Sequence, residues 1–377
     1  MTCLIIGNHT QGLGILRSLS TLGIETHVVN ETHISLSRFS KYITKYHFIK
    51  GKSLKYLYHL ENSEYLLRNI LRIVPEGQRW VIFGMNEDTI NFVYQNRDVL
   101  NERFLIPDNN IKLIIDKFYF AKEIEKIGLA SPKTFLLDNF NEDLLNNNFY
   151  VCKGRIGNKF RNLSNRKGME IKTKADLSRL KKGIKDFLNE DEVLLQQKIR
   201  KNKEVLSCCG FAIDGEILLS FQYVKLRQHP DEFGTGTFLK SIKNKEIFNQ
   251  SVSIIAHFAY TGIYEIEYVK DFDEQYYVIE VNPRTWKSIN FASNCGQNIC
   301  KAYYDYMKKN IIPAPNYDYV IDKTWVDLGT DVPVLIKNGQ FKNIGYNRNT
   351  CFCVLHTKDP LPFFTEMILF PLIMLNY

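Results

Sequence analysis

Several common signatures are absent from this sequence, and each absence excludes a class of protein. The eight cysteines form no C-x-x-C pair, so a zinc framework is not expected and the thiols should be buried and reduced. No run reaches the roughly 18 apolar residues that a membrane-spanning helix requires. The apolar residues at the N-terminus follow no basic segment, so they do not read as a signal peptide. A cytoplasmic protein is the simplest interpretation.

The segment nearest to a membrane span is the apolar stretch over residues 361–375. Pro362, Glu366 and Pro371 interrupt it, and it is too short to cross a bilayer. We expect it to form a C-terminal element packed on the protein. Peripheral association of this stretch with a membrane or a partner protein is the alternative.

The charge of the chain is unevenly distributed. The net charge is +8, from 49 Lys and Arg against 41 Asp and Glu. Residues 153–203 alone contain 16 basic and 6 acidic residues, so the excess belongs to this region. Local positive charge favours an anionic partner, which is a nucleic acid, an anionic membrane or a phosphate-bearing ligand. A solvated lysine-rich helix near residues 172–185 accounts for part of the excess.

The first hundred residues have the pattern of a small α/β domain. Apolar strands over 2–6 and 24–29 flank a helix over 11–22, which is a β-α-β unit of the doubly wound type. The turn over residues 7–14 is glycine-rich, yet it contains neither G-x-G-x-x-G nor a Walker A motif. The missing motifs count against a dinucleotide-binding enzyme and against a P-loop enzyme.

Three parts are expected along the chain: an α/β domain over 1–108, a second domain over 109–310 and a C-terminal portion over 311–377. The second domain should contain a subdomain over about 133–203, in which a loop over 154–168, rich in Gly, Asn and Arg, follows a strand. The remaining expected elements are a helix over 111–127 and strands over 80–83, 149–153, 193–197, 205–213, 216–223, 263–269 and 276–282.

The last two of these strands carry the most informative residues. Side chains alternate between the faces of a strand, so Glu280 and Asn282 point to the same side. An antiparallel pairing through the turn at 270–275 would place Glu267 beside Glu280. Two carboxylates and an amide oxygen are hard ligands suited to Mg²⁺, and without a cation the carboxylates would repel each other. Arg284 lies two residues further on and could reach a phosphate bound to the metal.

The pattern E-x12-E-V-N-P-R resembles the metal-binding hairpin of the ATP-grasp superfamily. Other segments resemble the same superfamily in the same order, including a lysine at the start of the second domain and a lysine before a flexible lid. The resemblance implies an α/β (α+β) fold in which a Rossmann-like domain precedes the ATP-grasp domain. It implies two Mg²⁺ ions, which Mn²⁺ can replace, held by Glu267, Glu280 and Asn282, and ATP held by Lys117, Lys153, Gln196, Gln197, Lys198, Ile199 and Glu204.

A closer resemblance is to a bacterial subgroup of carboxylate–amine ligases, which includes D-aspartate-ligase-like proteins and members linked to surface-polysaccharide pathways. It rests on residues 11–18, 37–41 and 225–237. It implies an ADP-forming ligase that phosphorylates a carboxylate and joins the acyl phosphate to an amine. The implied substrates are an amino acid and a cell-surface glycan or cell-wall precursor. The residues that would assist catalysis are Arg284, Arg227 and Lys225.

Two segments depart from the superfamily pattern. The hinge usually reads Gln-Glu, whereas here Gln196 is followed by Gln197. The loop over 154–168, which would close over the nucleotide as a lid, is more basic than in the superfamily. An anionic second substrate would account for the surplus of basic residues in this region. Separately, Glu87 should lie where the N-terminal domain faces the site. Because the lid is basic, its phosphate contacts would come from side chains such as Arg155, Lys159, Arg161 or Arg166.

The expected partners are small-molecule carboxylate and amine substrates, with no nucleic acid and no transmembrane segment, and a homodimer is plausible. One alternative is a carboxylate–thiol ligase. A second is an NAD(P)-linked oxidoreductase, in which Glu31 would act as the ribose-binding acid. A third is a protein that binds anionic ligands through residues 153–203. The basic residues begin at Lys153 and end near the hinge, which favours a nucleotide over a flat nucleic-acid surface.

Overall fold

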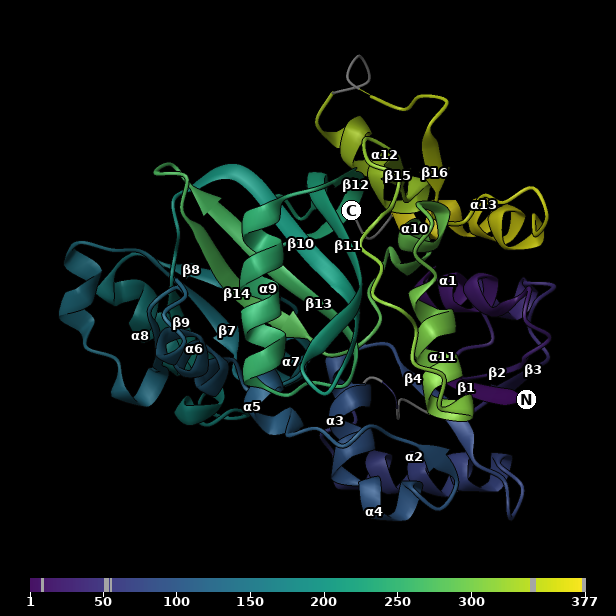
Figure 1. Cartoon of the computed structure of the whole chain (residues 1–377). Coiled ribbons are helices and arrows are strands. Elements are labelled where there is room, and N and C mark those ends of the chain that lie inside the picture. The colour runs from purple at the N-terminus through teal and green to yellow at the C-terminus, as the bar shows by residue number, and fades with distance from the viewer. Residues whose placement is uncertain (8–9, 51–53, 55, 340–343, 375–377) are drawn as a thin grey trace.

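The chain is built on three β-sheets in this computed structural model, which describes residues 1–7, 10–50, 54, 56–339 and 344–374. A five-stranded sheet forms the N-terminal domain at the lower right of Figure 1. A four-stranded sheet lies on the opposite side, and a seven-stranded sheet occupies the middle and reaches the C-terminal part.

The N-terminal sheet is entirely parallel, with the order β3-β2-β1-β4-β5. The predicted strands and the first helix are present. The direction of winding changes between β1 and β4, and in doubly wound sheets ligands bind at the carboxyl ends of the strands beside such a point. The elements are β1 (Thr2–Ile6), α1 (Thr10–Leu19), β2 (Glu25–Asn30), η1 (Leu36–Phe39), β3 (Lys45–Phe48), α2 (Leu60–Ile73), β4 (Trp80–Gly84), α3 (Glu87–Gln95), α4 (Arg97–Leu100) and β5 (Phe104–Leu105).

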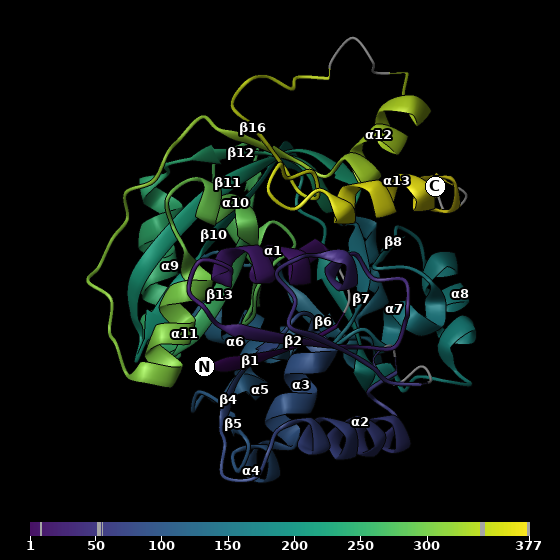
Figure 2. The same ribbon diagram turned by 90° about the vertical axis from the view of Figure 1, so that its right-hand side faces the viewer.

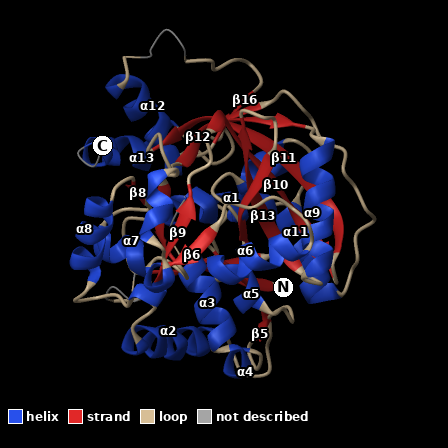
Figure 3. Cartoon of the chain, turned by 90° about the vertical axis from the view of Figure 1, so that its left-hand side faces the viewer, coloured by secondary structure: helices blue, strands red, loops and turns tan. Residues whose placement is uncertain are grey.

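The four-stranded sheet is antiparallel, with the order β6-β9-β7-β8, and it encloses a separate small core with its helices. Figure 3 shows α7 and α8 beside it. The lid segment, residues 154–168, was expected to be a loop, but it contains the helix α7, whose Phe160 is anchored in that core. The elements are β6 (Thr134–Leu136), η2 (Leu137–Asn139), η3 (Glu142–Asn146), β7 (Tyr150–Gly154), α7 (Lys159–Ser164), β8 (Met169–Ile171), α8 (Lys174–Ile184), η4 (Glu190–Glu192) and β9 (Val193–Gln197).

The seven-stranded sheet has the order β14-β13-β10-β11-β12-β15-β16 and is buried on both faces. Side chains alternate across it, so Cys208 packs in the core beneath α9 while Cys209 packs toward the N-terminal domain. The elements are β10 (Lys201–Ile213), β11 (Glu216–His229), β12 (Thr235–Ile242), α9 (Lys245–His257), β13 (Gly262–Asp271), β14 (Tyr276–Asn282), α10 (Ile289–Asn294), α11 (Ile299–Lys309), β15 (Thr324–Val326), α12 (Leu328–Lys337), β16 (Thr350–Phe352) and α13 (Leu361–Met374).

Two predicted element boundaries are wrong for identifiable reasons. The helix expected over 111–127 is divided into α5 (Ile111–Ile115) and α6 (Lys117–Lys126) because Asp116 caps the second helix. Its Oδ1 accepts hydrogen bonds from the backbone N–H groups of Phe118 and Tyr119. The strand expected over 216–223 continues to His229 as β11, and β12 begins at Thr235, which leaves only residues 230–234 between the two strands.

The cysteines agree with the prediction of buried thiols. All eight are unpaired, and Cys351 is the one that is only partly buried. No described helix has the length and apolar character needed to cross a membrane.

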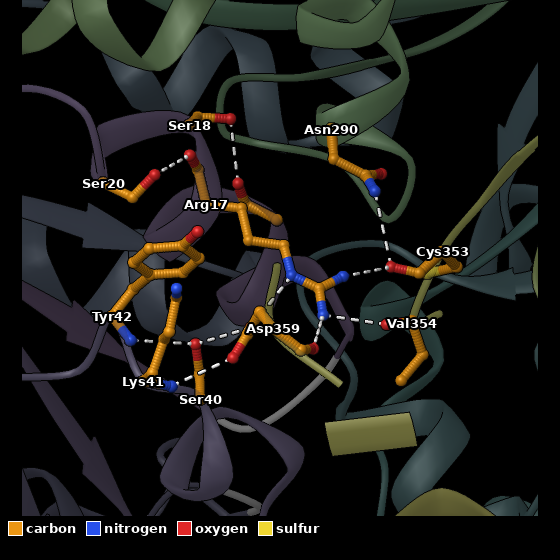
Figure 4. A network of polar contacts seen from close by, with 11 residues as sticks. Arg17, Ser18, Ser20, Ser40, Lys41, Tyr42, Asn290, Cys353, Val354 and Asp359 are labelled. Atoms are coloured by element: carbon orange, nitrogen blue, oxygen red, sulfur yellow. Dashed lines mark hydrogen bonds and ion pairs between the residues drawn. The ribbon is translucent and has the colours of Figure 1, made fainter. Parts of the chain in front are cut away.

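A buried ion pair fastens the N-terminal domain to the C-terminal part (Figure 4). Arg17 on α1 places Nε 3.1 Å from Oδ2 of Asp359, and the exposed fractions of the two side chains are 7% and 1%. The guanidinium also donates to the carbonyl oxygens of Cys353 and Val354. The carboxylate accepts from the Ser40 hydroxyl as well. Both charges are therefore satisfied only when these distant segments meet.

Replacement of Asp359 by Ala should destabilise the protein severely. The Arg17 guanidinium would stay buried without its carboxylate, and breaking a buried pair in this way costs about 3–5 kcal/mol. Urea denaturation measures this loss in the free energy of unfolding. Asp318→Ala, which removes the exposed ion pair with Lys243, is the control and should change little. Equal effects of the two substitutions would contradict the role given to Arg17 and Asp359.

Glu366 on α13 makes the stability depend on pH. Burial and the neighbouring Asp327 carboxylate raise the pKa of Glu366 from 4.5 to about 8. The folded protein therefore holds this proton more tightly than the unfolded chain does. The contribution is fully present below about pH 4.5 and is lost as the pH rises toward about 8.

We therefore expect Glu366→Gln to flatten the decrease in the free energy of unfolding between these two pH values, because the amide stays neutral throughout. Urea denaturation at a series of pH values measures the slope. Glu76→Gln, at an exposed position, is the control and should keep the wild-type slope. A Glu366→Gln profile identical to that of the wild type would refute the assignment.

Candidate functional site

A cavity of about 700 Å³ lies where the N-terminal domain, the four-stranded sheet and the central sheet meet. Its walls come from the carboxyl ends of β1, β2 and β4, from β7 and β9, and from β11, β13 and β14. Figure 2 shows the N-terminal domain in front of the central sheet in this arrangement. The predicted residues that line the cavity are Lys117, Lys153, Gln196, Gln197, Lys198, Ile199, Lys225, Glu267, Glu280, Asn282 and Arg284, together with Glu87.

The hairpin of β13 and β14 has the predicted register. Glu267 is the direct antiparallel partner of Glu280, and Glu265 is the partner of Asn282. The ladder shifts between Glu267 and Tyr268, so the two acidic residues sit where the regular pairing breaks. All four side chains line the cavity, which brings three carboxylates and one amide to a single wall.

This wall suits a hard divalent cation. The side-chain oxygens of Glu267, Glu280 and Asn282 are the ligand type that Mg²⁺ prefers. Arg284 donates from Nη2 to Oδ1 of Asn282 at 2.7 Å, which orients the amide. No group of three or more His, Cys, Asp or Glu side chains suited to a metal occurs among the described residues, so a metal here would rely on the amide as well as the carboxylates.

The carboxylates are compensated by cations from other elements. Burial alone would raise the pKa of Glu280, but Lys117 and Lys153 outweigh it and lower this pKa below its usual value. Lys117 lies at the start of α6, and its Nζ is 2.8 Å from Oε2 of Glu87. Burial opposes the charge of Lys117, yet Glu87 and Glu280 together raise its pKa. Glu87 thus holds Lys117, rather than standing apart as a substrate contact.

Lys153, one residue before the end of strand β7, lines the same cavity as the hairpin. Its Nζ donates to Oε1 of Gln196 on the neighbouring strand β9 at 3.0 Å. Burial lowers the pKa of Lys153, although Glu280 acts in the opposite direction. A lysine that is desolvated and only partly neutralised is well suited to accept an anionic ligand such as a phosphate.

The two predicted catalytic residues of β11 have different surroundings. Lys225 is buried, with 6% of its side chain exposed, and its Nζ lies 2.9 Å from Oε2 of Glu267. Arg227 is absent from the cavity lining; its guanidinium pairs with the fully buried Asp331 at 2.7 Å and lies 4.2 Å from the ring centroid of Phe238. Lys225 therefore faces the cavity, while Arg227 binds the β11 strand to α12.

The hinge residues line the cavity through β9 and the segment after it. The N–H of Lys198 donates to the Phe149 carbonyl oxygen, and its ammonium group pairs with Glu170. Glu204, predicted to bind ribose, lies on β10 with its side chain exposed and is not part of the cavity lining. Its assignment to the nucleotide stays a prediction.

The lid segment rests on the N-terminal domain. Asp88, near the start of α3, accepts hydrogen bonds from the backbone N–H and the side-chain amide of Asn158, at 2.8 and 3.0 Å. A Cβ at Gly157, where φ is +63°, would lie 2.5 Å from Oδ1 of Asp88. Glycine is therefore required there, both by the left-handed backbone and by the close approach of the carboxylate.

Much of the basic surplus in 153–203 is neutralised by ion pairs, while Lys153, Arg161, Lys167 and Lys198 line the cavity. At least seven of its 16 basic residues form ion pairs with carboxylates. Of the four lid side chains predicted to contact phosphate, Arg161 lines the cavity. Arg155 pairs with Asp116, and Lys159 pairs with Glu192.

Several residues in the cavity escaped prediction. Lys167 donates to the Thr235 hydroxyl, and burial and Arg161 lower its pKa to about 8. Glu265 accepts from the Tyr223 hydroxyl, and burial and Glu267 raise its pKa to about 7. Alternation along β13 already placed Glu265 on the face of Glu267, so that signal was available. Nothing local in the sequence marks Lys167.

Comparison with known proteins identifies the fold. A family profile described as carbamoyl-phosphate synthase L chain, ATP binding domain, matches residues 232–302, which include the β13–β14 hairpin. No curated protein matches the sequence significantly.

Three solved structures illustrate the similarity. N5-carboxyaminoimidazole synthetase from Staphylococcus aureus has a TM-score of 0.64 and 16% identity, over 91% of this chain and 86% of its own. L-amino acid ligase from Bacillus licheniformis has a TM-score of 0.59 and 14% identity, and the match covers 81% of this chain and 73% of the ligase. The biotin carboxylase domain of Hydrogenobacter thermophilus 2-oxoglutarate carboxylase was solved with MgADP, ADP and bicarbonate. It has a TM-score of 0.64 and 14% identity, and the match covers 85% of this chain and 73% of that domain. This chain therefore has the fold that these three solved structures share.

Proposed function

We propose that this protein is an ATP-dependent, ADP-forming ligase that activates a carboxylate as an acyl phosphate and joins it to an amine. The observation that carries the proposal is the wall formed by Glu267, Glu280 and Asn282, together with Lys117 and Lys153 in one cavity. Phosphoryl transfer requires neutralisation of the phosphate charge and positioning of the reactants rather than a protein nucleophile. A cation held by this wall, together with the two lysines, would supply both.

The residues divide into three groups by what they would bind. Glu267, Glu280 and Asn282 would hold Mg²⁺, whose bound charge would neutralise the phosphate oxygens during transfer. Lys117 and Lys153 would bind the phosphates. The hinge segment 196–199 would receive the base of the nucleotide.

The proposed reaction has two steps. A carboxylate oxygen of the first substrate attacks the γ-phosphorus of ATP, and the bond to the β-phosphate oxygen breaks to release ADP. The amine then attacks the acyl carbon, loses a proton, and expels inorganic phosphate. Arg284 and Lys225 would stabilise negative charge on the transferring phosphoryl group. An acyl phosphate hydrolyses in water, so the lid segment held by Asp88 would exclude solvent.

The similar structures support this proposal in general terms, since they include an amino acid ligase and a carboxylase domain bound to MgADP. The cavity gives little support for a strongly anionic second substrate, because its lining includes eight basic and seven acidic side chains. An oxidoreductase is disfavoured because the carboxylate of Glu31 already accepts a hydrogen bond from the backbone N–H of Leu54.

A substrate screen tests the reaction type. The protein would be incubated with ATP, Mg²⁺, amino acids, and uronic or amino sugars, and condensed products would be sought by mass spectrometry. With a carboxylate labelled by ¹⁸O, the inorganic phosphate should acquire one label, because the acyl phosphate passes a carboxylate oxygen to phosphorus. Release of unlabelled phosphate alongside product would exclude the acyl phosphate. A product formed with thiols but not with amines would favour the carboxylate–thiol alternative.

Replacement of Glu280 by Gln should abolish ligase turnover without unfolding the protein. The substitution keeps the size of the side chain but removes the charge that faces Glu267, and we expect a loss of at least about 10²–10³-fold in kcat. The exposed Glu274→Gln, in the turn of the same hairpin, is the control and should keep activity. Turnover close to that of the wild type in Glu280→Gln would rule out the metal wall.

Lys225→Met and Arg227→Met should affect different properties of the protein, the first mainly kcat and the second mainly the free energy of unfolding. Lys225→Met removes a cation from the cavity and should lower kcat, and it should cost less stability than Arg227→Met because its partner Glu267 keeps 21% of its side chain exposed to water. Arg227→Met leaves Asp331 buried and uncompensated, so it should lower the free energy of unfolding by about 3–5 kcal/mol. Thermal denaturation and steady-state kinetics on both variants separate the outcomes. A catalytic defect in an Arg227→Met protein of normal stability would instead support the catalytic role that the sequence predicted for Arg227.

A further inference from the structure

Helix α13 exposes an apolar stripe to solvent. The exposed fractions of Leu361, Phe364, Met367 and Ile368 lie between 57% and 79%. These residues follow the three- and four-residue spacing of one helix face. The opposite side carries Glu366, which is buried against the protein. The outer face of a surface helix is normally polar. The outer face of α13 is apolar instead.

The stripe continues onto the N-terminal domain. Helix α13 packs beside η1, and Figure 1 shows α13 at the edge of the molecule, above α1. Phe39, the last residue of η1, and Ile34, two residues before η1 begins, are 38% and 54% exposed. The exposed apolar set is therefore Ile34, Phe39, Leu361, Phe364, Met367 and Ile368.

The exposed charges on the two segments that carry this set, residues 32–50 and 344–374, have one sign. Residues 32–50 contain no acidic residue, and the acidic residues within 344–374 are Asp359 and Glu366, both buried. Arg38 lies on η1, and the backbone N–H of Lys41 bonds to Asp359 just before α13. The exposed basic residues of these two segments are Arg38, Lys41, Lys45, Lys50, Arg348 and Lys358.

We propose that the exposed apolar set docks the protein on an anionic lipid bilayer, with α13 lying in the plane of the surface. Apolar side chains beside exposed cations are the combination that binds such a surface, through apolar burial and attraction to anionic headgroups. Helix α13 is too short to span the bilayer, so the mode is peripheral.

The charge pattern favours a bilayer over a second copy of the chain. A two-fold interface pairs this face with itself, so it would bring the cations Arg38, Lys41 and Lys358 of one copy toward the cations of the other. Juxtaposed like charges oppose such an association. An anionic membrane instead complements every exposed charge around the apolar set.

Vesicle cosedimentation tests the proposal on the whole protein. Vesicles of phosphatidylcholine mixed with phosphatidylglycerol should bind it, pure phosphatidylcholine should bind it much more weakly, and high salt should reduce binding. The double substitution Phe364→Asp with Ile368→Asp should weaken binding by at least about tenfold. Arg38→Glu with Lys41→Glu should weaken binding to the anionic vesicles selectively.

The control is Phe272→Asp, which changes an aromatic residue that is 67% exposed in the turn between β13 and β14. It should bind vesicles as the wild type does, and thermal denaturation should show that all variants are folded. Absence of binding by the wild type overturns the proposal, as does equal loss in Phe272→Asp. A wild-type dimer in light scattering that becomes monomeric in the Phe364 and Ile368 variant would assign the face to a second copy instead.

Discussion

The repulsion between Glu267 and Glu280 is the constraint on which the rest of the site depends. The pairing of β13 with β14 places these carboxylates side by side in a buried wall. Two ionised carboxylates at that position are tolerated only if cations surround them. Lys117 from α6, Lys153 from β7 and Lys225 from β11 supply that charge. Helix α6 and the four-stranded sheet therefore meet the hairpin for an electrostatic reason.

The hairpin could be predicted from the sequence because its determinants are local. Strand alternation and a short turn define which side chains share a face, and the structure confirms the register of Glu267 with Glu280. Lys153 at the end of a strand was readable for the same reason. The break between α5 and α6 was not, because Asp116 caps α6 while it binds Arg155, a residue that is distant in the sequence.

Counting charges along the sequence was less informative than pairing them in space. The surplus in 153–203 pointed to an anionic partner for that region, yet many of these basic residues pair with carboxylates on the surface of the small subdomain. Asp88 and Lys167 reach the cavity from segments that look ordinary in the sequence. Only the docking of the lid segment on α3 brings Asp88 to Asn158, and no local pattern encodes that contact.

The ion pair of Arg17 with Asp359 has a consequence for biosynthesis. Arg17 leaves the ribosome among the first residues of the chain, whereas its partner is synthesised 342 residues later. Until then the guanidinium has no carboxylate, and the surface of α1 that will be buried stays exposed to water. The N-terminal domain can therefore reach its final packing only after Asp359 has been synthesised.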